Sequence, residues 1–535
     1  MGGYIQPTLA AAGLRWSLSA AALLSFDGAM NHAALPCFSI AHRFVPPWSR
    51  LLRPAAPLLC SLLLLACGGS VPSSTDELSP DTQQTSRQSA LSGPVFDLPQ
   101  IRDARSAACR FENERSLVKN GVALRVWNVR YLSWEWRDKE GSLPAGLRPI
   151  AIRAFAARPQ AGARLPALVQ AHGLGGFADE NAATSSAARL GLFVLAYTGP
   201  GGGTTPENTS EGKPASDGSG RRMFDTRPDV RGSWFWAHTA AAMRGLTCLS
   251  ARSDVDSSKL GMTGMSAGGV ATLLASGVDD RIKAAVPLSG LLAWDEAVRS
   301  PTAWQHTLLA NAGLSTASPE WMTLMSELID PRLALATSRA ALLLVNGSSD
   351  EFFPLTSQRA TAAGLPPGSG VRHSLIGNFD HGCYKLTGGE SASTIEARAV
   401  LHVEGGQRAF FRHHLLGDPA YPTIPRPPQV TATPLGAATY VVVQVDRPAG
   451  YDIDEVRLWW SSDGAFLFGS LNVPATSAGR YEKLVPLSLP AASAYYVDVQ
   501  YRTRSLLFPQ RFAISSEPVL QSGLVPRIRA INTCL

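Results

Sequence analysis

Short apolar runs alternate with longer helix-like segments through the middle of the chain. The runs are five to seven residues long, and we expect strands at 165–171, 192–197, 260–265, 282–288, 341–345 and 371–376. Between and after them, the pattern predicts helices at 181–190, 234–249, 267–276 and 393–416. Continuous apolar strands separated by helices predict a parallel sheet that is covered on both faces. Alternation from Val122 onward adds strand-like sequence before this series.

The pattern changes to a period of two after a proline-rich stretch. Residues 419–429 are expected to form a stiff linker, because prolines recur through them. Beyond the linker, one face of each expected strand is apolar, with the inward set Val456, Leu458, Trp460, Val497, Val499 and Tyr501. About a hundred residues of such strands without a convincing helix are typical of a β-sandwich. We therefore predict an α/β domain over 96–418 and an all-β accessory domain over 430–535.

Size and composition fit this two-domain prediction. The chain has 535 residues, 45% hydrophobic and 17% charged, which is typical of a globular protein with a large core. The net charge is +6, but no run of lysine or arginine stands out, so we expect no nucleic-acid partner. The glycine-rich stretch 197–203 lacks the Gly-Lys-Ser/Thr ending of a phosphate loop. No cofactor or metal is expected.

The N-terminal 66 residues are interpreted as a leader. Three arginines precede an apolar run over 55–66, which has the order of a secretory signal and is too short for a confident membrane span. The run ends in Leu64-Leu65-Ala66-Cys67, which resembles a bacterial lipobox. That resemblance implies lipid attachment at Cys67 and anchoring to a bacterial membrane. The alternative is ordinary signal cleavage and a secreted or periplasmic protein. Residues 67–95 are polar and are expected to be a flexible tether.

Four cysteines follow the expected leader and Cys67. They are Cys109, Cys248, Cys383 and Cys534, an even number in a chain that we expect to be exported. Two disulfides are possible, and the sequence does not choose among the three connectivities. Buried free thiols are the alternative.

The candidate chemistry is concentrated around Ser266. Gly264-Met265-Ser266-Ala267-Gly268 follows one expected strand and precedes a helix, which is the context of a G-x-S-x-G nucleophile elbow. The serine of such an elbow sits on a strained turn. Its small neighbours, Gly264 and Gly268, are expected to let the strand and the helix pass close together.

A candidate acid and a candidate base follow two later strands. Asp350 comes just after the strand 341–345, with Glu351 and Asp295 as competing carboxylates. His381 lies beside a glycine in the loop after the strand 371–376. Histidine suits a general base because its ordinary pKa, near 6.5, lets it take and return a proton at neutral pH. All of these positions follow strand ends, where open α/β sheets build their sites.

A glycine-rich turn after the strand 165–171 is the candidate for transition-state stabilisation. It reads His172-Gly173-Leu174-Gly175-Gly176, and the small Gly173 allows backbone N–H groups to face the nucleophile. We expect the N–H groups of Leu174 and Ala267 to form an oxyanion hole. We expect His172 to brace the turn rather than to react. The loop to residue 232 and a possible cap at 291–338 would lie over the site, although the tryptophans of this cap could equally belong to the core.

The order Ser266, Asp350, His381 is that of the α/β-hydrolases. Residues from about 120 to 416 resemble this superfamily and are similar to the acetylxylan-esterase and dienelactone-hydrolase group and to prolyl-oligopeptidase catalytic domains. The resemblance implies that Ser266 is the nucleophile, His381 the base and then the acid, and Asp350 the group that orients His381.

Three functions remain open at this point. The first is a serine esterase that forms an acyl-enzyme, with carboxylic esters, possibly acetylated carbohydrate polymers, as substrates. The second is a prolyl-oligopeptidase-like serine peptidase. The third is a non-catalytic, polymer-binding lipoprotein in which the hydrolase domain is degenerate. The triad order favours the first two.

Overall fold

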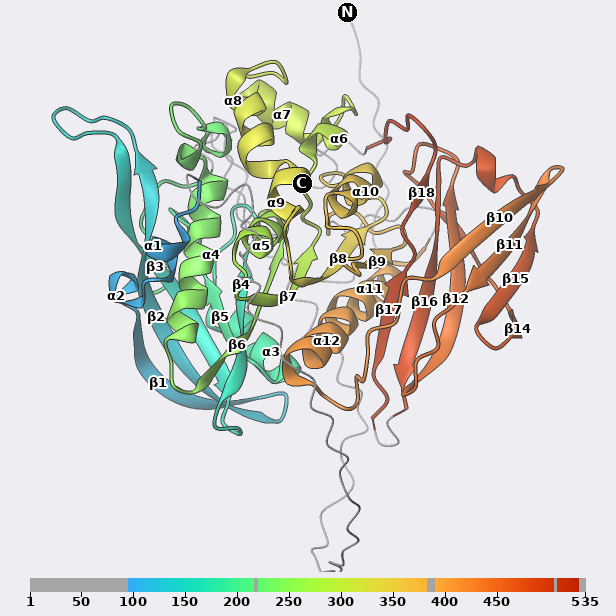
Figure 1. Ribbon diagram of the computed structural model, residues 1–535, viewed down its shortest axis with the longest axis horizontal. Helices are drawn as coiled ribbons and strands as arrows, with labels where there is room; N and C mark the ends of the chain where they lie inside the picture. The colour runs from blue at the N-terminus through green and yellow to red at the C-terminus, as the bar shows by residue number, and fades with distance from the viewer. Residues whose placement is uncertain (1–94, 216–219, 383–389, 505–507, 529–535) are drawn as a thin grey trace, which may run out of the picture.

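The computed structural model describes residues 95–215, 220–382, 390–504 and 508–528. The predicted fold class is confirmed. A mostly parallel central sheet with helices on both faces is followed by antiparallel C-terminal strands (Figure 1). Cys67, the expected leader, Cys383 and Cys534 lie outside the described residues. Within the described part of the chain, no helix has the length and apolar character needed to cross a membrane.

Six neighbouring parallel strands form the centre of the large sheet. In spatial order they are β5 (Phe193–Tyr197), β4 (Leu165–Ala171), β6 (Val255–Met265), β7 (Ile282–Leu288), β8 (Ala341–Gly347) and β9 (Arg372–Ile376). All six were predicted from their apolar runs. Since the strands are parallel, the loops after β4, β6, β8 and β9 leave the same edge of the sheet. The candidate residues are therefore delivered to one side of the molecule.

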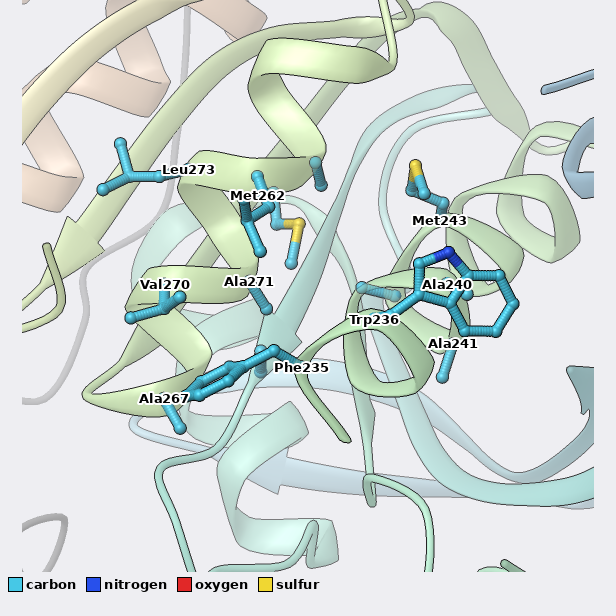
Figure 2. Close-up of a cluster of buried hydrophobic side chains, with 14 of the residues drawn as sticks. Phe235, Trp236, Ala240, Ala241, Met243, Met262, Ala267, Val270, Ala271 and Leu273 are labelled. Carbon is cyan, nitrogen blue, oxygen red and sulfur yellow. The ribbon is translucent and has the colours of Figure 1, made fainter. Parts of the chain in front are cut away.

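Helices cover both faces of this sheet. On one face, α4 (Trp234–Ser250) and α5 (Ala267–Val278) share a core cluster with Met262 of β6. Figure 2 shows Phe235 of α4 pointing toward the first turn of α5, beside Ala267. On the other face, α3 (Glu180–Leu190) and α12 (Gly406–Phe411) pack in a second cluster. Burial of apolar side chains on both faces stabilises the layers at roughly 25 cal/mol per Å² removed from water.

The expected helix over 393–416 is more irregular than its sequence pattern suggested. The structure has α11 (Ala392–Val400), a π-helical turn at Leu401–Gly405, α12, and a second π-helical turn at Arg412–Leu416. Helical structure is present along the segment as predicted. Its hydrogen-bonding pattern changes at two places.

Three antiparallel strands precede the parallel series. They are β1 (Arg110–Lys119), β2 (Val122–Arg137) and β3 (Gly146–Pro159), with β3 paired to β5. The alternation from Val122 predicted β2. Strand β1 was missed because it lies at the sheet edge and is rich in charged residues, so its apolar signal is weak.

The chain enters this sheet through two short helices, α1 (Leu98–Arg102) and α2 (Ala104–Ala107), which pack on α4. The guanidinium of the fully buried Arg244 donates hydrogen bonds to the carbonyls of Gln100, Ile101 and Asp103. A disulfide joins Cys109, just before β1, to Cys248 in α4. One of the possible pairings is thus formed, and it fastens the start of the described chain to the long helix.

Short helices fill most of the segment where a cap was considered. They are α6 (Trp294–Val298), α7 (Trp304–Asn311), α8 (Pro319–Thr323) and α9 (Pro331–Leu335), and α6 to α8 lie together at the top of Figure 1. Trp294 and Trp321 are core residues, only 1% and 4% exposed, whereas Trp304 is half-buried. The loop after β5 lies against these helices, since Thr226 Oγ1 donates to the Glu320 carbonyl at 2.8 Å.

The C-terminal strands form two sheets, as a sandwich requires. The strands β12 (Tyr451–Ser461), β13 (Gly469–Asn472), β16 (Ala494–Thr503) and β17 (Arg511–Ser515) continue the large sheet, because Ser515 of β17 pairs with His373 of β9. The second sheet has the order β10 (Gln429–Leu435), β11 (Ala438–Gln444), β15 (Arg480–Val485) and β14 (Ala475–Ser477). The short β18 (Val519–Leu520) pairs with β16. Apolar residues from both sheets share one cluster.

The strands of the large C-terminal sheet are buried more extensively than the period-two pattern suggested. Val456, Leu458 and the inward residues of β16 are buried as expected. Trp459 and Asp498, which alternate with them, are also buried, at 1% and 2% exposure. The second face is covered because segments of the preceding α/β part pack on it. The predicted division into two domains at residues 419–429 stays a prediction. The large sheet contains strands from both sides of this segment.

Candidate active site

Ser266 occupies a sharp turn between β6 and α5. Its φ is 55° and its ψ is −120°, a left-handed backbone conformation that is uncommon for a residue with a side chain. A Cβ on Gly264 would lie 2.4 Å from the Gly268 carbonyl oxygen, and one on Gly268 would lie 2.5 Å from the Ala171 carbonyl oxygen. Glycine at both positions is therefore needed for the close approach of strand and helix. The elbow has the predicted geometry.

The structure brings Ser266, His381 and Asp350 together. The His381 Nε2 atom lies 2.9 Å from Ser266 Oγ, and its Nδ1 atom lies 3.0 Å from Asp350 Oδ2. An ionised carboxylate only accepts hydrogen bonds, so Nδ1–H donates to Asp350 and Nε2 accepts from the serine hydroxyl. The Oδ1 atom of Asp350 also accepts the N–H groups of Phe352 and Phe353 at 2.9 and 2.8 Å. This backbone pair fixes the carboxylate.

The competing carboxylates lie in other places. Asp295 is exposed on α6. Glu351 is buried, and its Oε2 atom accepts the backbone N–H of His381 at 2.9 Å rather than a ring nitrogen. Glu351 thus holds the histidine loop, a role that its position beside Asp350 in the sequence did not indicate.

Burial and charge change the protonation of this group of residues. Burial, with the neighbouring charge of Asp350, raises the pKa of Glu351 to about 7. Burial by itself lowers the pKa of His381, but the charge of Asp350 and the hydrogen bond to it outweigh burial, so the pKa of His381 lies above 6.5. A base with this pKa is available at neutral to mildly alkaline pH.

The glycine-rich turn after β4 packs directly against the elbow. A Cβ on Gly173 would lie 3.2 Å from the Ser266 Cβ atom. The N–H groups of Leu174 and Ala267 donate no hydrogen bond to another described residue, and Ala267 begins α5. A helix N-terminus carries partial positive charge and unpaired N–H groups, which favour an anion. Leu174 follows Gly173 and Ala267 follows Ser266, the two residues in contact here, and the assignment of their N–H groups to an oxyanion hole stays a prediction.

His172 braces the glycine-rich turn, as predicted. Its Nδ1–H donates to the Gly173 carbonyl at 2.6 Å, and its Nε2 accepts the N–H of Gly199 at 2.7 Å. The ring therefore joins the turns after β4 and β5. Burial lowers the pKa of His172 to about 4, which keeps the ring neutral in this bracing role at pH 7.

Aromatic rings connect the site to the short helices of residues 291–338. The Phe352 ring meets the His381 ring edge to face at 4.2 Å between centroids. Trp304 of α7 contacts Phe352 in the same way at 5.0 Å, and Gln305 donates to the Phe352 carbonyl. The helical segment thus reaches the surroundings of the base through one aromatic contact.

Two protein families match parts of the chain that contain this site. Residues 144–296 match the acetyl xylan esterase (AXE1) family and include the His172 turn and the elbow. Residues 230–386 match the prolyl oligopeptidase family (peptidase S9) and include Ser266, Asp350 and His381. The matched region is an α/β-hydrolase of these two families. The chain is thereby a serine hydrolase of the group that both families share. No curated protein matches it in sequence.

Solved structures of several hydrolases are similar to the chain. The acetyl xylan esterase from Paenibacillus sp. R4 is 17% identical, with a TM-score of 0.42, covering 56% of this chain and 91% of its own. Acetyl xylan esterase 1 from Thermoanaerobacterium sp. JW/SL YS485 is 17% identical, with a TM-score of 0.41 and coverages of 54% and 88%. The acylaminoacyl peptidase of Pyrococcus horikoshii is 14% identical, with a TM-score of 0.36 and coverages of 57% and 56%.

Proposed function

We propose that this hydrolase cleaves carboxylic esters through an acyl-enzyme on Ser266. The observation that carries the proposal is the hydrogen-bonded chain from Ser266 Oγ through His381 to Asp350, with separations of 2.9 and 3.0 Å. A serine is a weak nucleophile on its own, and an adjacent oriented base activates it. The match to the acetyl xylan esterase family favours short acyl esters of carbohydrates as substrates.

The reaction proceeds in two halves. His381 Nε2 takes the hydroxyl proton as Ser266 Oγ bonds to the ester carbonyl carbon, and the carbonyl oxygen becomes an oxyanion between the N–H groups of Leu174 and Ala267. The carbon–oxygen bond to the alcohol then breaks, and His381 returns its proton to the leaving oxygen. Water attacks the acyl-enzyme with His381 again as base, releasing the acid and restoring Ser266. Asp350 stabilises the imidazolium in both halves.

Peptide hydrolysis is a second candidate because the prolyl oligopeptidase match spans all three residues. The deciding experiment compares p-nitrophenyl acetate, acetylated xylan and a panel of peptide amides, with wild type and Ser266→Ala. We expect ester turnover that is lost in Ser266→Ala and peptide turnover that is much slower. If the wild type cleaves peptides faster than esters, the peptidase is correct. If neither class shows Ser266-dependent turnover, the hydrolytic role of this site is wrong.

We also propose that the enzyme is exported and anchored by lipid on Cys67. The lipobox-like sequence supports the anchor, and the Cys109–Cys248 disulfide supports export because such bonds persist in oxidising compartments. Metabolic labelling with a palmitate analogue tests the anchor. Wild type is expected to be labelled and Cys67→Ala unlabelled, and an unlabelled wild type would count against the anchor.

A further inference from the structure

The loop that carries His381 is held from two sides. It follows β9, and its first residues, Gly377 and Asn378, precede His381 by only a few positions. On the hydrolase side, the Asn378 N–H donates to Ser348 Oγ at 2.8 Å, and the N–H of Ser349 donates to the Phe379 carbonyl at 3.1 Å. These bonds connect the loop to the segment that carries Asp350.

The other side of the loop is held by the C-terminal strands, residues 429–528, which we call the C-terminal unit. The Nδ2 of Asn378 donates to the Phe468 carbonyl at 2.9 Å, and the Phe468 N–H donates to Asn378 Oδ1 at 2.8 Å. Both polar atoms of the Asn378 amide are thus paired with the backbone of one residue of the C-terminal unit. Asn378 has a φ of 53°, in the left-handed region that asparagine tolerates better than most residues.

The indole ring of Trp459, in β12, packs against the same loop. A Cβ on Gly377 would lie 2.4 Å from the Trp459 ring, so the glycine backbone rests on the indole. The Arg398 guanidinium stacks over this ring at 4.6 Å and donates to the Gly377 carbonyl. Glu390 pairs with Arg398 and accepts from Asn378 Nδ2 at 2.9 Å. The contact is therefore both apolar and polar.

The segment that carries Asp350 is packed against the C-terminal unit as well. Leu355 and Leu375 of the hydrolase share a core cluster with Trp459, Phe468 and Leu524. The cavity left between the Asp350 segment and residues 524–528 is about 10 Å³, close to the smallest volume that admits one water molecule. Acid and base loops thus lie on a common support from the C-terminal unit.

We infer that the C-terminal unit is a structural part of the active site, in which Asn378 and Trp459 are positioning residues for His381. This inference rests on the proposed function of His381 as the base. A base displaced by about 1 Å can cost roughly 10²-fold in rate. Loss of the contacts that Asn378 and Trp459 make should therefore lower kcat. KM should stay nearly unchanged, since neither residue contacts the serine.

The test compares three variants of the full chain. Asn378→Gly removes the side-chain amide at a backbone conformation that glycine accepts. Trp459→Leu removes the indole ring that packs against Gly377. The matched control is Phe512→Leu, which removes a buried ring from the same sheet, where Phe512 contacts Tyr451 and Tyr501. The readouts are kcat and KM with p-nitrophenyl acetate, the rate of labelling by a fluorophosphonate, and hydrogen exchange of the segment 377–382.

We expect Asn378→Gly and Trp459→Leu to lower kcat and labelling by about 10- to 10²-fold and to speed exchange of residues 377–382. Phe512→Leu should lower thermal stability without these effects. If Asn378→Gly and Trp459→Leu have the same kcat and the same exchange rate of residues 377–382 as the control Phe512→Leu, the inference is overturned. A wild type without Ser266-dependent turnover would refute the proposed function instead, and the exchange comparison would still decide whether the C-terminal unit holds the loop.

Discussion

Replacement of Asp350 by asparagine would test the proposed proton pathway most directly. In wild type, Oδ1 accepts the N–H groups of Phe352 and Phe353, and both carboxylate oxygens lie near His381 Nδ1, Oδ2 at 3.0 Å and Oδ1 at 3.1 Å. The asparagine oxygen must occupy the first position, because two N–H donors point at it. Its NH₂ group then takes the place of Oδ2, 3.0 Å from Nδ1, where it opposes a proton on Nδ1 and favours Nδ1 as the acceptor.

The consequence is a change of tautomer. The ring proton moves to Nε2, which points at Ser266 Oγ at 2.9 Å and can no longer take the hydroxyl proton. We expect kcat to fall by about 10⁴-fold, or about 5 kcal/mol of transition-state stabilisation. The thermal midpoint should change little, because the backbone N–H partners are kept.

The assay is steady-state ester hydrolysis from pH 5 to 9, with Ser266→Ala as the measure of background. Wild-type kcat/KM should rise with pH through the pKa of His381, above 6.5, since only the neutral ring is a base. A fall of less than about tenfold in Asp350→Asn, in a folded protein, would refute this assignment of the proton pathway.

Two further predictions concern Glu351 and the disulfide. The pKa of Glu351, raised to about 7 in the folded protein against 4.5 when unfolded, makes stability fall as pH rises between these values. Glu351→Gln should therefore raise the thermal midpoint more at pH 8 than at pH 5. It should also lower the pKa of His381, because the charge of Glu351 raises that pKa, so kcat/KM should begin to rise at a lower pH. An equal shift at both pH values would contradict this. Replacing Cys109 and Cys248 by alanine should cost up to about 5 kcal/mol of unfolding free energy for a 139-residue separation, with kcat retained. Urea titration measures the loss, and a change below about 1 kcal/mol would contradict the loop-entropy reasoning.

Local sequence signals were sufficient for the central sheet and for the residues gathered at its edge. The strands β4 and β7 begin and end where their apolar runs do, because continuous burial leaves a continuous apolar sequence. The order of Ser266, Asp350 and His381 was readable since each follows such a strand. The structure brings these side chains within hydrogen-bonding distance.

The remaining features depend on pairings between distant parts of the chain. Trp459 looked like an outward residue of an amphipathic strand, and only the packing of Gly377 on it explains its burial. Asn378 carries no motif, and its partner Phe468 contributes backbone atoms alone, which no side-chain pattern can indicate. Glu351 was visible only as a competitor of its neighbour, because its partner is also a backbone N–H.

The attachment of the first described residues to α4 has a mechanical consequence. Arg244 donates hydrogen bonds to three carbonyl groups of this entry segment, and Trp236 Nε1 donates to the Val95 carbonyl at 2.6 Å. The Cys109–Cys248 disulfide follows a few residues later. A pulling force applied through the preceding part of the chain would be borne by this helix and its covalent cross-link. The loops at the ends of β8 and β9, which align the acid and the base, lie outside these attachments, so such a force would not act on them directly.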